Sequence, residues 1–137
     1  MKIVSACLAG IKCRFDGRAE PCQKVIELVK KGEALPLCPE RLGGLPTPRA
    51  KTEVKKGRVY TKDGQDLTDK YKKGAAAALR VAKLVGCKMA ILKSKSPSCG
   101  VGKIFDGTFS GKLIKGDGIF ARLLKENKIK VLTEKEI

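Results

Sequence analysis

The chain contains no histidine and no tryptophan, and only 4% of its 137 residues are aromatic. Without histidine, Ser-His-Asp and Cys-His catalytic arrangements are excluded, as are zinc sites with histidine ligands. Few aromatic side chains are available as stacking platforms for single-stranded nucleic acid. No apolar run approaches the roughly 20 residues that span a bilayer, and the N-terminal stretch lacks the features of a signal peptide. We therefore expect a cytoplasmic protein without a membrane span.

The composition is that of a globular, strongly basic domain. Hydrophobic residues make up 42% and charged residues 32%, and 30 Lys and Arg against 14 Asp and Glu give a formal charge of +16. The length predicts one domain, residues 1–137. The charge permits an anionic partner such as RNA. The basic residues are spread along the whole chain, which is also typical of a lysine-rich solvated surface.

The order of apolar segments predicts an α/β fold. Strands are expected at residues 2–6, 34–37, 89–93 and 129–133, and helices at about 21–32, 68–85 and 118–126. The segment 52–61 is expected to form a small hairpin, 38–50 and 94–102 are expected to be loops, and 104–118 a loop or a hairpin. Because strands alternate with helices, we predict a small, mostly parallel, Rossmann-like sheet flanked by helices, with a hairpin insertion.

Three of the cysteines follow predicted strands. The six are Cys7, Cys13, Cys22, Cys38, Cys87 and Cys99. Cys7, Cys38 and Cys99 come after the first, second and third strands, and the carboxyl ends of parallel strands meet in one crevice. No C-x2-C pair of the kind common in zinc sites is present, whereas three separated thiolates suit a [4Fe–4S] cluster with one open iron. The alternative is three buried free thiols, the role that we expect for Cys22 and Cys87.

Five motifs resemble one known family. They are VSACLAGIKCRFDG (4–17), CPERLGGLPTPRAKTE (38–53), KDGQDLT (62–68), AILKSKSPSCG (90–100) and IFDGTFSGKLIKGDG (104–118). In this order they resemble the small bacterial and archaeal thiouracil desulfurase (desulfidase) family over nearly the whole chain. The resemblance implies a [4Fe–4S] cluster held by Cys7, Cys38 and Cys99. It also implies removal of sulfur from a small thiolated nucleobase or nucleoside, without net redox change. Ala9 and Phe15 depart from the residues usual in the family.

Further candidates lie in the same motifs. In a chain without histidine, a carboxylate with a raised pKa is the natural general base, and both this argument and the resemblance indicate Glu40. Ser96 is expected to hydrogen-bond substrate or water, with Ser98 as the competing choice, although serines in such loops often cap turns. Gly43 and Gly44 form either an anion-binding nest or a plain turn.

Three family-like residues keep open roles. Cys13 either guards the pocket or sits beside the open iron. Asp16 either contacts substrate or makes a turn. Arg49 either binds substrate or pairs with an acid such as Glu53.

The leading functional hypothesis is iron–sulfur-dependent desulfuration of a thiolated base or nucleoside, with an RNA fragment as another carrier of the same sulfur. A second enzyme hypothesis is sulfur transfer into tRNA by a similar cluster. It requires a site that activates the base with ATP, and the chain has no P-loop. A third hypothesis is a basic RNA-binding module without catalysis, whose affinity would fall steeply with salt.

Overall fold

The computed structural model describes all 137 residues and has one main sheet of four parallel strands in the order β2-β1-β5-β8. The strands are β1 (Lys2–Ser5), β2 (Ala34–Leu37), β5 (Met89–Leu92) and β8 (Lys130–Thr133). Apolar runs suit this position because both faces of a parallel sheet are covered. All four predicted strands are confirmed, and the edge position of β2 tolerates Pro36, since an edge residue needs no second hydrogen-bonded neighbour.

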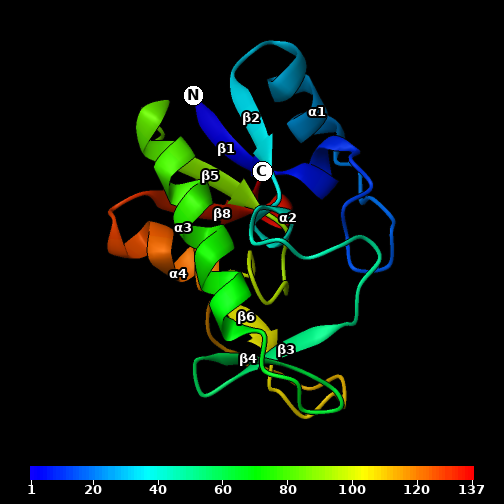
Figure 1. Ribbon diagram of the computed structural model, residues 1–137. Coiled ribbons are helices and arrows are strands. Elements are labelled where there is room, and N and C mark those ends of the chain that lie inside the picture. Colours follow the sequence, from blue (N-terminus) through cyan, green and yellow to red (C-terminus); the bar gives the residue numbers. More distant parts are fainter.

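Helices cover both faces of this sheet. On one face, α3 (Thr68–Leu84) and α4 (Ile119–Glu126) pack over a core that includes Ile3, Ala90 and Leu92 (Figure 1). On the other face, α1 (Gln23–Lys30) packs over Val4 and Ile91. Neighbouring strand residues thus face opposite cores, as the two-residue period of a strand requires. The predicted α/β architecture is confirmed. None of the helices has the length and apolar character needed to cross a membrane.

Residues 38–50 contain an element that the sequence did not predict. The short helix α2 (Pro39–Leu42) begins with Pro39 at a first-turn position, where the missing N–H of proline is no loss. Helix α2 crosses α3 at backbone contact. A Cβ at Gly43 would collide with the carbonyl oxygen of Lys70, and one at Gly74 with that of Pro39. These two glycines allow α2 to pack this closely on α3.

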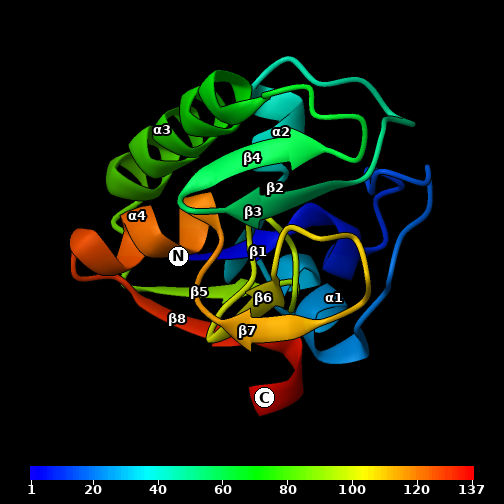
Figure 2. The ribbon, with the colours of Figure 1, turned by 90° about the horizontal axis from the view of Figure 1, so that it is seen from below.

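Two antiparallel hairpins lie together beyond the carboxyl ends of the main sheet (Figures 1 and 2). They are β3 (Thr52–Lys55) with β4 (Arg58–Thr61), and β6 (Lys103–Phe105) with β7 (Leu113–Lys115). The first is the hairpin predicted for residues 52–61. The second shows that residues 104–118, expected to be a loop or a hairpin, form a hairpin. They share a small core, composed of Leu45, Val54, Val59, Tyr71 and Ile104.

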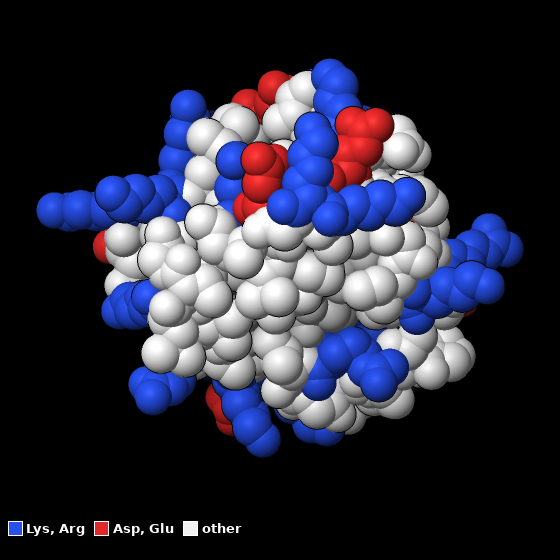
Figure 3. Space-filling view, turned by 90° about the horizontal axis from the view of Figure 1, so that it is seen from above, with Lys and Arg blue, Asp and Glu red and all other residues white.

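The first strand is one residue shorter than expected. It ends at Ser5 and continues as a 3₁₀ helix, η1 (Ala6–Ala9), which Gly10 closes in the left-handed conformation. The C-terminal residues form a second 3₁₀ helix, η2 (Glu134–Glu136), directly after β8. Lys and Arg side chains are distributed around the visible face of the molecule rather than gathered in one patch (Figure 3).

Candidate active site

A cavity of about 460 Å³ opens where β1, β2 and β5 end. Four of the six thiols line it: those of Cys7, Cys13, Cys38 and Cys99. The structure therefore brings the three strand-end cysteines together, at the edge of a parallel sheet where ligands commonly bind. Cys13 joins them from the loop that follows η1.

Each strand-end thiol is placed by a different local structure. Cys7 lies in η1, directly after β1. Cys38 is the residue between β2 and α2 and occupies the N-cap of that helix. Cys99 lies in the loop after β5 and is 5% exposed. Because the three segments come from neighbouring strands, the sheet fixes their relative positions.

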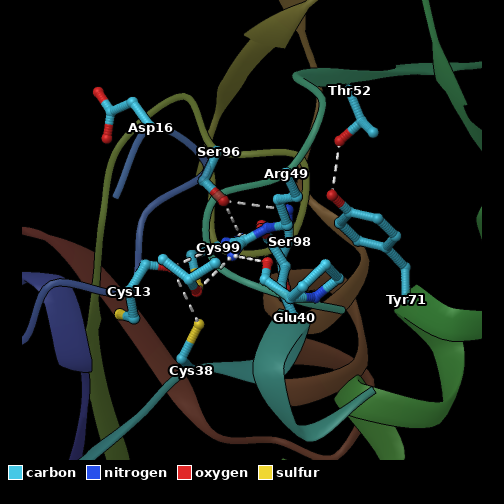
Figure 4. A network of polar contacts seen from close by, with 12 residues as sticks. Cys13, Asp16, Cys38, Glu40, Arg49, Thr52, Tyr71, Ser96, Ser98 and Cys99 are labelled. Carbon is cyan, nitrogen blue, oxygen red and sulfur yellow. Dashed lines mark hydrogen bonds and ion pairs between the residues drawn. The ribbon is translucent and has the colours of Figure 1, made fainter. Parts of the chain in front are cut away.

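Hydrogen bonds of Ser96 and Ser98 hold the loop that contains Cys99 in place. The carbonyl oxygen of Ser98 accepts hydrogen bonds from the N–H groups of Phe120 and Ala121, in the first turn of α4. The Ser96 hydroxyl accepts from the N–H groups of Ser98 and Cys99 (Figure 4). Ser96 lines the cavity, whereas Ser98 is 1% exposed, does not line it, and leaves its buried hydroxyl oxygen without a partner. Of the two serines, Ser96 is the one placed to meet a ligand.

The cavity thiols differ in acidity. Burial, with the neighbouring charge of Cys38, raises the pKa of Cys7 to about 11. Burial also raises the pKa of Cys99. For Cys38, the hydrogen bond with the Cys13 thiol lowers the pKa to about 7, helped by the N–H of Arg41 and outweighing burial. Cys38 is therefore the cavity thiol that ionises closest to neutral pH.

Glu40 and Arg49 form a pair in the cavity wall. Nε and Nη2 of Arg49 both donate to Oε2 of Glu40 (Figure 4), and Nη2 also donates to the carbonyl oxygen of Cys13 at 2.9 Å. Arg49 therefore pairs with an acid, as one of its two expected roles required, but the acid is Glu40 and not Glu53. Glu53 instead accepts hydrogen bonds from backbone N–H groups of the second hairpin. Burial raises the pKa of Glu40, and the charge and hydrogen bonds of Arg49 oppose this.

Three other predicted residues lie outside the cavity lining. Asp16 accepts a hydrogen bond from the N–H of Arg18, so it makes the turn that was the alternative to a substrate contact. Gly43 packs against the backbone of α3, and Gly44 adopts φ +89° in the turn after α2. The structure gives none of the three a contact with the cavity.

Two further side chains of the lining belong to a tyrosine and a lysine. Tyr71 shares a 2.6 Å hydrogen bond with the Thr52 hydroxyl (Figure 4), and its position on the apolar face of a helix suggested only a core residue. Lys93 also lines the cavity, and its Nζ lies 3.1 Å from Glu20 and 2.9 Å from Glu134. This partly buried network connects the residue after β5 with the C-terminal 3₁₀ helix.

The donor set fits a group larger than one metal ion. No three His, Cys, Asp or Glu side chains lie close enough together to hold a single ion. The strand-end thiols instead surround a cavity, and soft thiolates without imidazole favour an iron–sulfur cluster. The lining also carries six cationic side chains, which stabilise thiolates: Arg14, Arg49, Lys51, Lys93, Lys95 and Lys135.

Fold and site together define a parallel α/β protein with a thiol-lined cavity beside a buried carboxylate. The chain belongs to the 2-thiouracil desulfurase family, whose model matches residues 3–136. It is similar to YbbK of Bacillus subtilis (strain 168), an uncharacterized protein, with 42% identity covering 100% of this chain and 97% of YbbK. It is also similar to the solved structure of the [4Fe-4S]-dependent thiouracil desulfidase TudS, with 40% identity and a TM-score of 0.94, covering 98% of this chain and 91% of that one. The resemblance found in the sequence motifs is confirmed.

Proposed function

We propose that this chain is an enzyme that removes sulfur from a thiolated pyrimidine by hydrolysis. The thiocarbonyl group and water give a carbonyl group and hydrogen sulfide, so the reaction involves no net oxidation or reduction. The observation that carries the proposal is that Cys7, Cys38, Cys99 and Glu40 line one cavity. Membership of the 2-thiouracil desulfurase family and the likeness to TudS support it.

Three thiols would hold the cofactor, a [4Fe–4S] cluster. We assign Cys7, Cys38 and Cys99 as its ligands, because each follows a different parallel strand and all three line the cavity. When bound, such a cluster supplies one iron without a protein ligand, which attracts soft thiocarbonyl sulfur and polarises the carbon–sulfur bond. Cys13 remains a thiol at the cavity wall, where its carbonyl oxygen is held by Arg49.

Glu40 takes the proton of the attacking water in this proposal. Arg49 binds Oε2 of the carboxylate, while no protein group donates to Oε1, which is therefore free to accept from water. Ser96 supplies a hydrogen bond. Its hydroxyl oxygen already accepts from two N–H groups, so its O–H remains free to donate to substrate or water.

The substrate class follows from the size of the cavity. Its volume of about 460 Å³ must hold the cluster beside the substrate, which favours a base or a nucleoside, and we propose these rather than an RNA fragment as the substrate. The two hairpins contribute Thr52 and Phe105 to the cavity lining, and Lys51 lines it directly before β3.

Anaerobic reconstitution with iron and sulfide, followed by a 2-thiouracil assay, tests the proposal. The wild type should take up about four irons per chain and convert 2-thiouracil to uracil and sulfide. Cys7→Ala, Cys38→Ala and Cys99→Ala should each lose the visible chromophore and the activity. Cys22→Ala, whose thiol does not line the cavity, should keep both. Equal iron uptake by all four variants would refute the ligand assignment.

A further inference from the structure

Two of the four phenylalanines line the cavity in this aromatic-poor chain. Of the four, Phe120 is fully buried in the main core and Phe109 lies in the second hairpin, away from the thiol-lined cavity. Phe15 and Phe105 are half-buried, and both line the cavity. The third aromatic residue of the lining, Tyr71, is only 2% exposed. Phe15 and Phe105 therefore offer the aromatic surface that a ligand can reach.

Phe105 is held rigidly beside the loop of Cys99. It is the last residue of β6, where its neighbour Ile104 is 5% exposed and packs in the hairpin core. Side chains alternate along a strand, so Phe105 projects to the other side, which is the cavity. Ile104 also pairs with Lys95 in a β-bridge, which ties β6 to the segment leading into Ser96.

Phe15 is held through Arg49. The carbonyl oxygen of Phe15 accepts a 2.8 Å hydrogen bond from the N–H of Arg49, whose side chain binds Glu40. Each ring also has a cation near it. The guanidinium of Arg14 lies 5.8 Å from the Phe15 ring centre, and Nζ of Lys51 lies 4.7 Å from that of Phe105. Both rings are thus positioned by contacts that also build the site.

The chemistry of the thiols and of Glu40 concerns the thiocarbonyl group alone. Neither feature distinguishes a pyrimidine from an open-chain thioamide, so recognition of the ring needs a different surface. A planar heterocycle stacks favourably on a phenylalanine ring, which loses little conformational freedom when it binds. Phe15 and Phe105 lie on the cavity wall and are only half-buried, as such recognition requires.

We propose that Phe15 and Phe105 bind the pyrimidine ring of the substrate by stacking and are the residues that determine its specificity. This inference rests on the function proposed above, and it adds a role for two residues outside the thiol and carboxylate machinery. The product uracil has the same ring without the sulfur. It should therefore depend on the two phenylalanines as strongly as the substrate does.

The test measures ring binding separately from chemistry on the cluster-loaded protein. For Phe105→Ala and Phe15→Ala, the KM for 2-thiouracil and the inhibition constant of uracil should rise together, by roughly tenfold or more. The iron content should stay that of the wild type, and kcat should change less than KM. Phe109→Ala, at a position outside the cavity lining, is the matched control and should leave both constants unchanged.

Tyrosine and leucine substitutions separate stacking from apolar bulk. Phe105→Tyr should keep the wild-type inhibition constant of uracil, and Phe105→Leu should lose as much affinity as alanine does. Leucine matching phenylalanine, or unchanged constants in both alanine variants, would overturn the inference while leaving the desulfurase function intact. If the wild type turned over no 2-thiouracil, the function itself would fail. The dissociation constant of uracil, measured by equilibrium dialysis on wild type and variants, would still decide the role of the rings.

Discussion

Arg49 binds a single oxygen of Glu40. Its Nε and Nη2 both donate to Oε2, while Oε1 has no protein donor (Figure 4). The same guanidinium donates to the carbonyl oxygens of Cys13 and Pro46. A planar fork with five donors can make all these bonds at once, which an ammonium group cannot. Arg49 therefore orients the carboxylate and fixes the cysteine loop at the same time.

This geometry predicts different results for two substitutions. Glu40→Gln removes the proposed proton acceptor and should lower kcat by about 10²–10⁴-fold, with the iron content unchanged. Arg49→Lys keeps the positive charge but not the fork, and should lower kcat by roughly tenfold because the carboxylate is less well oriented. Steady-state kinetics on protein with quantified iron measures both.

Arg58→Lys is the matched control for the arginine substitution. Arg58 binds Asp66 at the surface of the first hairpin, away from the cavity, and its replacement should not change kcat. Wild-type activity in Glu40→Gln would exclude this carboxylate as the base. Loss of iron in Glu40→Gln would instead place Glu40 among the groups that hold the cluster.

The acidities of the thiols predict an order of modification in cluster-free protein. The pKa of Cys38 is lowered to about 7, so its thiolate fraction rises as the pH passes through 7, whereas Cys7, with a pKa of about 11, stays protonated until much higher pH. Thiolates react with iodoacetamide and thiols do not. Between pH 7 and 8, peptide mapping by mass spectrometry should therefore find Cys38 alkylated before Cys7 and Cys99. Faster labelling of Cys7 would contradict this order of acidity.

Much of the fold follows from local sequence patterns. The strand at 34–37 is predicted by a short apolar run, and the helix at 68–85 by apolar residues that recur with the helical period. The meeting of Cys7, Cys38 and Cys99 could also be predicted, because one rule about the ends of parallel strands locates all three. This prediction requires only that the strand before each cysteine is recognised in the sequence.

Long-range side-chain contacts could not be predicted in this way. Nothing near Arg49 in the sequence indicates that it binds Glu40 rather than Glu53, because the choice depends on how α2 crosses α3. Tyr71 lies on the buried face of α3, and that same face reaches the cavity where the helix begins. Such contacts depend on the packing of elements, which a local pattern does not encode.

The network around Lys93 predicts an acid-sensitive stability. Burial alone would raise the pKa of Glu134, but hydrogen bonds from Lys93 and the N–H of Ser94 outweigh it and lower that pKa. The stabilisation is therefore complete above the unfolded-state pKa and is lost as the pH falls through the lower folded-state pKa. Glu134→Gln should lose about 1–2 kcal/mol of unfolding free energy at pH 7 and much less below pH 4, measured by urea denaturation. An equal loss at both pH values would show that ionisation of Glu134 contributes nothing.

The crossing of α2 and α3 predicts a remote effect on the site. Because a Cβ at Gly74 would collide with the carbonyl oxygen of Pro39, Gly74→Ala must push α2 away from α3 and move Glu40 with it. We expect a loss of about 1–3 kcal/mol in stability and a lower kcat. Lys73→Ala, at an exposed position of the same helix, should change neither. Thermal unfolding and the 2-thiouracil assay measure both effects, and wild-type kcat in Gly74→Ala would mean that α2 does not need this close contact.

Glu53 holds the two hairpins together from a buried position. It is 2% exposed, and its Oε1 accepts 3.0 Å hydrogen bonds from the N–H groups of Gly107 and Phe109, while Oε2 is buried without a partner. Glu53→Ala should cost about 2–4 kcal/mol, because it leaves both N–H groups unpaired, and Glu53→Gln, which keeps one acceptor oxygen, should cost less. Since the second hairpin carries Phe105, the alanine variant should also raise the KM for 2-thiouracil, with kcat less affected. Urea denaturation and steady-state kinetics on the two variants measure this, and equal stability of Glu53→Ala and wild type would show that these hydrogen bonds do not hold the hairpin in place.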